Sequence, residues 1–530
     1  MTTTTAKFLR SRISKVCVAI TGTTPAEMVE KATAVIKETP FLEFRLDYLN
    51  KPLLALPLLK QFFIENTAVI AIATCRRSAN GGKFDGTLNG ELDVLIKASE
   101  AGFHLVDLEI ESAEALKKAE LQKQREAGAA LLISHHDFNS TKDLDRVFAR
   151  IQVFEPDFVK IVPTAKSLID NVTLIRFLER VSDSANVVGI CMGDAGIISR
   201  VLGLRAGGAF TFASASSGDE TGPGQIDARS LIDHYRIDQI DAATKIYGVA
   251  GNPVKSSLSP IMLNSAFRRE TVNAVYLALQ ATKLPDLLKL IHEIPIQGIS
   301  VTMPFKQEVM AFLEKTDPLS TKIGACNTIL RAPDGKLYGF NTDVSGVIRP
   351  LEKRISSLRG AKVLVLGAGG VGRAAIFGLR DKGADVFILN RTPETAQKVA
   401  KQSGAKTIKR EAIAKTTFDV IINATSVGMA GQKASSLLEP KELNTKLVFD
   451  LVYNPLETPL LRMARQQNIP IITGVEMFVQ QGARQFEIWT GKPAPEEEML
   501  RVVLHALRKQ ADTSLEASVA KPVKLKIKAK

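Results

Sequence analysis

Two separate sets of residues in this chain of 530 amino acids could do chemistry. In the first half, His136 and Lys160 lie near the ends of apolar, strand-like runs. In the second half, Lys306 and Asp343 come before a glycine-rich loop at residues 367–372. A lysine with a histidine is typical of imine formation and proton transfer, whereas a lysine and an aspartate near a nucleotide loop are typical of hydride transfer. The sequence therefore predicts two catalytic sites with different chemistries.

The composition fits a multidomain globular protein. At 530 residues the chain is too long for one hydrophobic core, and its apolar share of 45% is ordinary. No apolar run approaches the roughly 20 residues that cross a bilayer. The four cysteines show no CxxC spacing, which favours buried, reduced thiols in a cytoplasm-like compartment. We expect no metal site and no membrane partner.

The net charge of +13 raises the question of a nucleic-acid partner. Part of this charge lies in residues 521–530, which are rich in lysine and have no core pattern. We interpret this segment as a solvated tail. No basic stretch interleaved with aromatic residues provides a stacking surface, and the chain has a single tryptophan. We therefore expect no nucleic-acid partner and assign the remaining positive charge to anionic small molecules.

Eight short, apolar, β-rich runs follow one another in the first half of the chain. They are residues 16–21, 41–49, 68–76, 104–110, 130–138, 158–164, 187–194 and 209–215. Several stretches between them have helical spacing, as in residues 26–37, 143–153 and 167–181. Strands that alternate with helices indicate parallel βαβ units, and eight such units in roughly 225 residues predict a (β/α)8 barrel.

Polar residues gather where these predicted strands end. A charged side chain in an apolar barrel strand is costly unless it faces a site or a partner. In a (β/α)8 barrel the carboxyl ends of the strands carry the active site. We therefore expect one rim to carry Arg45, Asp47, Arg76, Asp107, Glu109, Ser134, His136, Asp137, Lys160 and Arg200.

A second α/β architecture begins near residue 245. The predicted elements are a strand at 246–251, a helix at 259–267, strands at 298–301 and 362–366, a helix at 373–379 and a strand at 385–389. The strand at 362–366 runs directly into the glycine loop. This order is what a dinucleotide-binding fold requires, because the glycines let a pyrophosphate approach the helix N-terminus.

The end of the strand at 385–389 bears on the choice of cofactor. In NAD-specific folds this strand usually ends in Asp or Glu, which accepts a hydrogen bond from the ribose 2′-hydroxyl. Here Asn390, Arg391 and Thr392 stand in that place. An arginine with a hydroxyl suits a 2′-phosphate, so the sequence favours NADP.

With these residues in view, the chain resembles two known enzyme families. The first half resembles type I 3-dehydroquinate dehydratase, in residues 43–47, 74–76, 134–138, 159–161, 192–200 and 223–225. The second half resembles shikimate dehydrogenase, in residues 251–260, 301–306, 324–328, 339–346 and 423–428 and at Gln481. The resemblance covers nearly everything from Val16 to Leu507, in the fused order of the bifunctional enzymes of the shikimate pathway.

The first resemblance implies that Lys160 forms an imine with the ketone of 3-dehydroquinate. His136 would remove the neighbouring proton and then protonate the departing hydroxyl, as its near-neutral pKa permits, whereas His135 is expected to be structural. The implied substrate-binding residues are Glu43, Arg45, Arg76, Arg200, Thr221 and Gln225. Two positions depart from the family pattern. Asn80 stands where many relatives place a glutamate that supports the catalytic histidine, and Thr221 stands where serine is usual.

The second resemblance implies that Lys306 and Asp343 form the acid–base pair that reduces 3-dehydroshikimate with NADPH. The implied substrate-binding residues are Ser257, Ser259, Thr302, Asn327, Asp343, Tyr453 and Gln481. The implied cofactor-binding residues are Gly367, Ala368, Gly369, Gly370, Val371, Gly372, Asn390, Arg391, Thr392, Thr425 and Gly474. A second basic residue that relatives often carry just beyond Thr392 is missing here.

These observations predict an α/β protein with an N-terminal (β/α)8 barrel followed by a two-lobed dehydrogenase. The expected parts are a tail at residues 1–15, the barrel at 16–240, a substrate-binding lobe at 241–345 completed by 476–507, a Rossmann-like NADP-binding lobe at 346–475 and a basic, disordered tail at 508–530.

The leading interpretation is a bifunctional enzyme that dehydrates 3-dehydroquinate and reduces the product to shikimate. Two alternatives stay open: a quinate/shikimate dehydrogenase with an impaired dehydratase half, and a metabolite sensor without turnover. We expect small-molecule substrates and a monomer or weak oligomer. The expected compartment is the cytoplasm, or a plastid in a plant.

Overall fold

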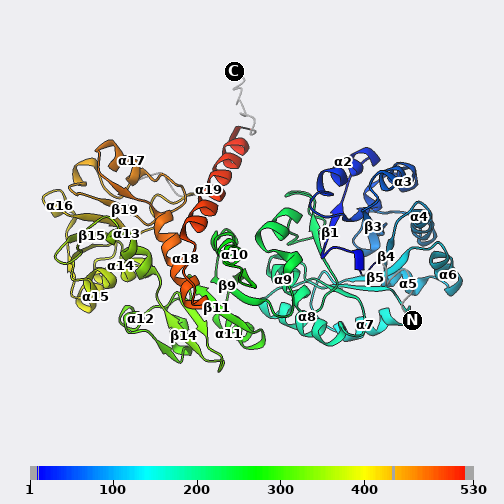
Figure 1. The fold of residues 1–530 in the computed structure, drawn as a ribbon, viewed down its shortest axis with the longest axis horizontal. Helices are drawn as coiled ribbons and strands as arrows, with labels where there is room; N and C mark the ends of the chain where they lie inside the picture. Colours follow the sequence, from blue (N-terminus) through cyan, green and yellow to red (C-terminus); the bar gives the residue numbers. More distant parts are fainter. Residues whose placement is uncertain (1–8, 10, 432–435, 520–530) are drawn as a thin grey trace, which may run out of the picture. The chain divides into compact units, whose positions relative to one another are not determined.

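The computed structural model describes residues 9, 11–431 and 436–519 of the chain (Figure 1). These residues fall into two compact units. The first contains Met1–Lys245 and Asn273–Pro295, and the second contains Ile246–Val272 and Ile296–Lys530.

The first unit is built on an eight-stranded parallel sheet in the order β7-β6-β5-β4-β3-β2-β1-β8. The amide of Ala209 donates to the carbonyl of Val187 at 2.8 Å, which joins the two ends of the sheet. The predicted barrel is thus confirmed, with one strand in each predicted run. The strands are β1 (Val16–Ile20), β2 (Phe41–Arg45), β3 (Ile70–Thr74), β4 (Leu105–Glu109), β5 (Ala130–His136), β6 (Phe158–Val162), β7 (Val187–Gly189) and β8 (Thr211–Ser214).

Helices surround these strands, as Figure 1 shows. They are α2 (Pro25–Val35), α3 (Leu56–Glu65), α4 (Leu88–Glu100), α5 (Ile110–Ala115), α6 (Lys118–Glu126), α7 (Leu144–Gln152), α8 (Leu168–Val181) and α9 (Ile197–Arg205). Three of these helices were predicted from the amphipathic spacing of the sequence. Helices α2, α7 and α8 begin and end within about two residues of the predicted bounds, which is the usual uncertainty of helix ends.

In β4 and β6 the inward face of the barrel changes from apolar to polar along the strand. Side chains alternate between the two faces of a strand, so every second residue points inward. In β4, buried Leu105 is followed on that face by Asp107 and Glu109, and in β6 buried Phe158 is followed by Lys160. The apolar layer fills the lower part of the barrel and leaves the polar rim above it.

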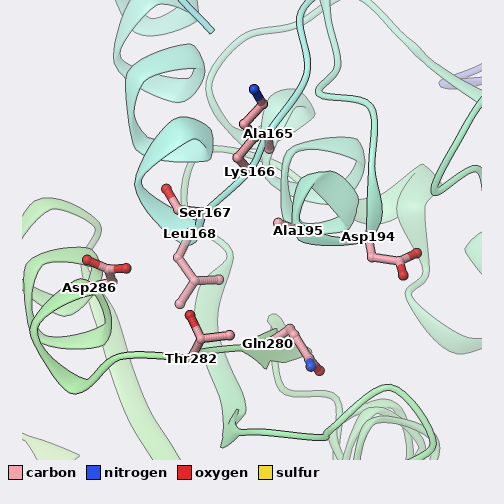
Figure 2. A pocket seen from close by; sticks show the side chains of 9 residues that line it. All are labelled: Ala165, Lys166, Ser167, Leu168, Asp194, Ala195, Gln280, Thr282 and Asp286. Atoms are coloured by element: carbon pink, nitrogen blue, oxygen red, sulfur yellow. The ribbon is translucent and has the colours of Figure 1, made fainter. Parts of the chain in front are cut away.

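Strand β10 (Ala274–Gln280) and helix α11 (Leu284–Glu293) also belong to the first unit. They border a pocket of about 300 Å³, which Figure 2 shows. Its lining consists of Ala165, Lys166, Ser167, Leu168, Asp194, Ala195, Gln280, Thr282 and Asp286. None of the predicted site residues lines this pocket, so it is distinct from the barrel rim.

The second unit begins with the strands β9-β11-β13-β14-β12 of a six-stranded mixed sheet whose order is β10-β9-β11-β13-β14-β12. Strands β9 and β11 are parallel, and β13 is antiparallel to β11 and β14. The strands are β9 (Lys245–Gly251), β11 (Ile296–Val301), β12 (Lys315–Thr316), β13 (Thr328–Arg331) and β14 (Leu337–Phe340). The helices of this lobe are α10 (Ser259–Arg269), α12 (Pro318–Ile323) and α13 (Asp343–Glu352).

A second, fully parallel sheet has the order β17-β16-β15-β18-β19-β20. This is the strand order of a Rossmann fold, as predicted. The strands are β15 (Lys362–Leu366), β16 (Asp385–Leu389), β17 (Lys406–Thr407), β18 (Val420–Asn423), β19 (Val448–Asp450) and β20 (Ile471–Ile472). The helices are α14 (Gly370–Asp381), α15 (Pro393–Ser403), α16 (Arg410–Ile413) and α17 (Pro459–Gln466).

Both faces of this sheet are covered. Val363 and Val365 of β15 pack with residues of α13, α14 and α15 in one apolar cluster, whereas Leu364 and Leu366 pack with residues of α16 and α17 in another. A parallel strand buried on both faces reads as a continuous apolar run, which is what the sequence shows at 362–366.

The chain ends in two helices, α18 (Gly474–Thr490) and α19 (Glu496–Val519). Helix α18 contacts the substrate lobe, since Trp489 Nε1 donates to the carbonyl of Ile329 at 3.0 Å. Helix α19 buries Met499, Val503 and Leu507 and then continues to Val519, past the boundary at 507 where we expected a tail. Residues 508–519 contain no glycine or proline, so their helix propensity permits this extension. The predicted tail segments at 1–8 and 520–530 lie outside the described residues. Among the described helices, none is long and apolar enough to span a bilayer.

Candidate active sites

Strand register brings the barrel residues to one level. Glu109 of β4 pairs with Ser134 of β5, and Ser134 pairs with Lys160 of β6. His136 lies two residues beyond Ser134, so it points to the same face. The predicted catalytic pair therefore shares the inner rim of the barrel.

Lys160 is buried, and its Nζ lies 2.9 Å from Asp107 Oδ2 and 3.4 Å from Glu43 Oε1. The same ammonium lies 4.0 Å from the centroid of the Phe212 ring. Burial alone would raise the pKa of Asp107, but the charges of Lys160 and Arg76 and the Ser134 hydroxyl outweigh burial and hold this pKa well below its usual range. Asp107 thus stays ionised and anchors the lysine.

His136 contacts a second buried carboxylate. Its Nδ1 lies 2.6 Å from Glu109 Oε1, and the same oxygen lies 2.7 Å from Arg76 Nε. Burial lowers the pKa of His136 well below its ordinary value, and the charges of Arg76 and Lys160 act in the same direction. Burial also raises the pKa of Glu109 to about 7, against the effect of Arg76. The imidazole is therefore neutral at neutral pH, with a pKa lower than the near-neutral one we expected.

The three predicted substrate-binding arginines differ in their partners. Arg45 makes a bidentate ion pair with Asp47 at 2.9 and 2.8 Å, and Arg76 pairs with Asp107 and Glu109. Arg200 reaches only the carbonyls of Phe212 and Pro223, at 3.4 and 3.3 Å, and pairs with no carboxylate among the described residues. Burial lowers the pKa of Arg200 to about 10. A buried cation without a counterion is suited to an anionic ligand.

The remaining predicted residues of this half lie around the rim. Thr74 of β3 donates its hydroxyl to Glu43 Oε1 at 2.8 Å, which orients the predicted ligand Glu43. In the loop after β8, the amide and hydroxyl of Thr221 donate to Gln225 Oε1 at 2.7 and 3.1 Å. The threonine in place of serine therefore keeps the hydroxyl contact.

The two positions that raised questions lie next to each other. His135 Nδ1 lies 3.3 Å from Glu111 Oε1, and Asn80 Nδ2 donates to Glu111 Oε2 at 3.4 Å. The neighbouring histidine thus has its own carboxylate, as expected for a structural residue. Asp107 and Glu109, which we placed on the rim without a role, prove to be the partners of Lys160 and His136. Asp107 and Glu109 are two residues apart in one strand, so both point into the barrel. This spacing was the signal from which their contacts with Lys160 and His136 could have been predicted.

In the second unit the structure brings Lys306 and Asp343 together, with Nζ and Oδ2 2.5 Å apart. Asn327 donates to the other oxygen of Asp343 at 2.8 Å. The carbonyl oxygen of the Asn327 side chain accepts from the Thr342 amide at 2.7 Å and from the Thr328 hydroxyl at 2.8 Å. These bonds fix the orientation of the asparagine amide and hence of the carboxylate.

A residue that sequence reasoning missed extends this network. Gln485 of α18 is buried, and both ends of its side-chain amide are used. Its Oε1 accepts from the Ser300 hydroxyl at 2.8 Å, and its Nε2 donates to Thr328 Oγ1 at 3.2 Å. The sequence offers no local signal for this contact, because Gln485 and Thr328 are 157 residues apart.

The other predicted substrate residues form smaller groups. Ser257 Oγ accepts from the amide of Ser259 at 3.2 Å, at the start of α10. The methyl group of Thr302 packs so closely on Gly251 that a Cβ there would lie 2.4 Å from it. Tyr453 stacks on Phe478 with centroids 4.7 Å apart, and Gln481 donates to the Phe478 carbonyl at 2.9 Å. Burial raises the pKa of Tyr453, so its hydroxyl stays protonated.

The glycine loop has room for a dinucleotide. Gly367 ends β15 with φ +100°, a conformation that favours glycine, and a Cβ on Gly372 would lie 2.4 Å from the Gly367 carbonyl. A Cβ on Gly369 would meet nothing within 4 Å, so this backbone faces open space. A Cβ on Gly370 would lie 3.8 Å from the Lys306 side chain, which places the loop beside the lysine that we predicted to be catalytic.

Other predicted cofactor residues surround this loop. Asn390 accepts from the Ala368 amide at 3.1 Å and donates to the Thr392 carbonyl at 2.9 Å, so it ties the end of β16 to the loop. Arg391 and Thr392 are exposed. Thr425 follows β18 and lies against Gly367, and Gly474 begins α18 against the Val452 carbonyl. An open glycine loop beside an exposed arginine fits NADP.

Comparisons with known proteins agree with this geometry. Residues 16–242 match the family model of type I 3-dehydroquinase. Residues 249–329 match the shikimate dehydrogenase substrate binding domain, 350–455 the shikimate/quinate 5-dehydrogenase domain, and 474–504 the shikimate 5′-dehydrogenase C-terminal domain. The barrel and the two lobes thus define a lyase fused to an NADP-dependent oxidoreductase.

Several known proteins are similar to this chain. A chloroplastic bifunctional 3-dehydroquinate dehydratase/shikimate dehydrogenase of Arabidopsis thaliana is 35% identical over 498 residues, which cover 89% of this chain and 81% of that protein. An NADP(+) shikimate dehydrogenase of Pyrococcus furiosus is 43% identical over 51% of this chain and 99% of its own. A Thermus thermophilus shikimate 5-dehydrogenase, solved with NADP(H) and shikimate, is 35% identical over 50% of this chain and all of that one, with a TM-score of 0.47.

The chain belongs to the family of bifunctional 3-dehydroquinate dehydratase/shikimate dehydrogenases. It has both activities, with NADP as the cofactor of the second, so the leading interpretation of the sequence is confirmed. The oligomeric state and the compartment stay predictions.

Proposed function

We propose that Lys160 catalyses the dehydration by forming an imine with the ketone of 3-dehydroquinate. The Lys160 ammonium first loses a proton to solvent, and its amine then attacks the carbonyl carbon. The carbonyl oxygen takes up two protons, one of them from the nitrogen, and leaves as water. The resulting iminium withdraws electrons from the adjacent carbon and makes its proton acidic. Loss of this proton gives an enamine, which expels the β-hydroxyl. Water then hydrolyses the iminium and releases 3-dehydroshikimate and the free amine, so the net change is the loss of one water.

We assign the proton transfers to His136. A base must be unprotonated before it acts, and burial keeps the imidazole neutral by lowering its pKa. His136 takes the proton from the carbon next to the imine and returns it to the departing hydroxyl, which leaves as water. The location of His136 and Lys160 on adjacent strands, facing the same rim, is the observation that carries this assignment.

Arg200 is proposed to bind the substrate carboxylate. Among the three predicted arginines it alone lacks an acidic partner in the described chain, so a bound carboxylate would supply the missing counterion. Charge-assisted hydrogen bonds of this kind orient as well as attract. Glu43, Arg45, Arg76, Thr221 and Gln225 are proposed to hold the ring hydroxyls around it.

For the second activity we assign proton transfer to Lys306, held by Asp343. When bound, NADPH supplies a hydride to the ketone carbon of 3-dehydroshikimate. The ketone oxygen gains negative charge as a result, and the ammonium of Lys306 stabilises this charge and donates the proton. Asp343 positions the lysine through their 2.5 Å contact, and Asn327 positions Asp343. Ser257, Ser259, Thr302, Tyr453 and Gln481 are proposed to hold the hydroxyls and the carboxylate.

We infer that Arg391 binds the 2′-phosphate of NADPH. It follows β16 at the carboxyl edge of the sheet, and Asn390 fixes the backbone just before it. Arg391→Ala should raise the KM for NADPH by about 10-fold or more and leave the KM for NADH nearly unchanged, because only NADPH carries the phosphate. Lys398→Ala, on the following helix, is the control. An unchanged ratio of the two KM values would refute the assignment.

The imine assignment can be tested by chemical trapping. Borohydride added with 3-dehydroquinate reduces an imine to a stable amine, so mass spectrometry should find a covalent adduct on Lys160. Lys160→Ala should show no adduct and no rise in enone absorbance. Lys166→Ala, a nearby exposed lysine, should behave like the unmodified protein. An adduct on another lysine, or none at all, would sink the proposal.

A further inference from the structure

We infer that Glu109 is the positioning residue that orients His136 and holds its charge during dehydration, and that it does so in place of a carboxylate at position 80. This inference rests on the proposed function of His136 as the base. Glu109 does not need to touch the substrate for this role, because it acts through the imidazole.

The first observation is the direct contact. Glu109 Oε1 lies 2.6 Å from His136 Nδ1, and both side chains are buried. The carboxylate lies at ion-pair distance from Nδ1, although the two atoms do not have the geometry of a hydrogen bond, so it acts on the imidazole through its charge. It also stabilises the imidazolium that forms when Nε2 takes a proton, as the acidic residue does in a Ser-His-Asp triad.

The second observation is that the other carboxylates nearby are engaged elsewhere. Asp107 holds Lys160 at 2.9 Å and accepts from Ser134 at 2.5 Å. Glu111 contacts His135 at 3.3 Å and Asn80 at 3.4 Å. Asn80 carries no charge, so it cannot stabilise an imidazolium. Glu109 is therefore the carboxylate that the structure places on the catalytic histidine.

The third observation is that Glu109 is itself held in place. Arg76 Nε contacts the same oxygen at 2.7 Å and also bonds to Asp107 at 3.3 Å. A buried acid without a cation would be protonated and would lose its charge. Arg76 opposes this loss and so helps Glu109 to keep its charge beside His136. The charged groups that act on the pair are Arg45, Arg76, Asp107, Glu111 and Lys160.

Glu109→Gln tests the inference, because it keeps the size of the side chain and removes its charge. The kcat for dehydration should fall by about 100-fold or more, as expected when the carboxylate behind a catalytic histidine is lost. The acid limb of the kcat/KM profile should move to lower pH, since the imidazolium loses its stabilising anion. A purely structural role would leave that limb where it is.

Glu111→Gln is the matched control, because this acid lies two residues away and contacts the other histidine. It should keep kcat within about threefold of the unchanged protein, as expected for a partly exposed ion pair. Borohydride trapping at Lys160 should persist in Glu109→Gln, since imine formation does not need His136. Persistent trapping also shows that the site is folded.

The possible results distinguish a failure of the proposed imine at Lys160 from a failure of the proposed role of Glu109. If the unchanged protein gives no adduct at Lys160, the proposed function fails. If trapping succeeds but Glu109→Gln keeps its kcat within threefold and its pH profile unchanged, the role of Glu109 is overturned. Equal losses of kcat in Glu109→Gln and Glu111→Gln would overturn it as well.

Discussion

At the scale of single residues, the type of a side chain says less about its role in binding than the groups that it contacts. Three arginines were predicted to bind substrate from their positions alone. Two of them prove to be paired with acids, and Arg200 contacts only carbonyl groups. The sequence cannot reveal this difference, because the partner of each arginine comes from another strand or loop. This difference in pairing is the reason why we propose Arg200 as the anion site.

Arg200→Gln should therefore weaken substrate binding without weakening the fold. Loss of a charge-assisted bond to the carboxylate costs roughly 1.5–3 kcal/mol, so the KM for 3-dehydroquinate should rise by about 10- to 150-fold. The melting temperature of the protein without ligand should stay the same or rise, since an unpaired buried charge is removed.

Steady-state kinetics and a thermal melt check both parts of this prediction. Arg229→Gln is the control, because its side chain is 74% exposed and pairs only with Asp233 on the surface. An Arg200 variant with an unchanged KM would contradict the assignment of the carboxylate site.

At the scale of helices and strands, the predictions were accurate where a short stretch of sequence has a characteristic pattern. Apolar runs indicated the barrel strands, and the glycine loop indicated the turn from β15 to α14. The tail that we expected from residue 508 begins as helix instead, because α19 continues past Leu507 to Val519. Contacts between elements far apart in the sequence could not be predicted, such as the one between Gln485 on α18 and Thr328.

Helix α18 should contribute to the dehydrogenase through this residue. Gln485→Leu removes the bond to Thr328, which in turn bonds to the oxygen that orients Asn327. Asn327 then positions Asp343 less well, and small errors of position are costly in catalysis. We expect kcat for reduction to fall by about 10-fold, since a lost buried amide bond costs roughly 1.5 kcal/mol.

The rate of NADPH oxidation measures this effect, with dehydration as the internal reference. Arg484→Leu changes the adjacent, exposed position and should leave both rates nearly unchanged. If Gln485→Leu reduced as fast as the unchanged protein, the network would have no role in catalysis.

At the scale of the whole molecule, the described residues predicted for each site fall within one unit. All the barrel residues fall in the first unit, whereas Lys306, Asp343 and the glycine loop fall in the second. The sequence analysis also placed the two sets of motifs in separate halves, but it assigned residues 273–295 to the substrate-binding lobe, whereas they belong to the first unit in the structure. The product of the first site is the substrate of the second, so one chain supplies both enzymes at equal amounts.

Lys306→Ala should accordingly abolish reduction and leave dehydration within about twofold of the unchanged rate, because single substitutions in separate units act independently. Lys160→Ala should do the reverse when 3-dehydroshikimate is supplied. An equal mixture of the two variants, given 3-dehydroquinate and NADPH, should make shikimate through the free intermediate. Loss of dehydration in Lys306→Ala would show that the two sites depend on each other.

The Oε1 atom of Glu109 in the barrel links substrate binding with proton transfer, two events that are usually measured in separate experiments. Glu109 Oε1 contacts both Arg76, which is proposed to hold the substrate, and His136, which takes the proton. A ligand that draws Arg76 toward itself weakens the hold of the guanidinium on Glu109, and the proton affinity of the Glu109–His136 pair rises. By thermodynamic reciprocity, protonation of the pair then favours the ligand to the same extent. We therefore expect ligand binding at Arg76 and protonation of the Glu109–His136 pair to be coupled, with His136 acting as the base in the molecules whose pair stays unprotonated.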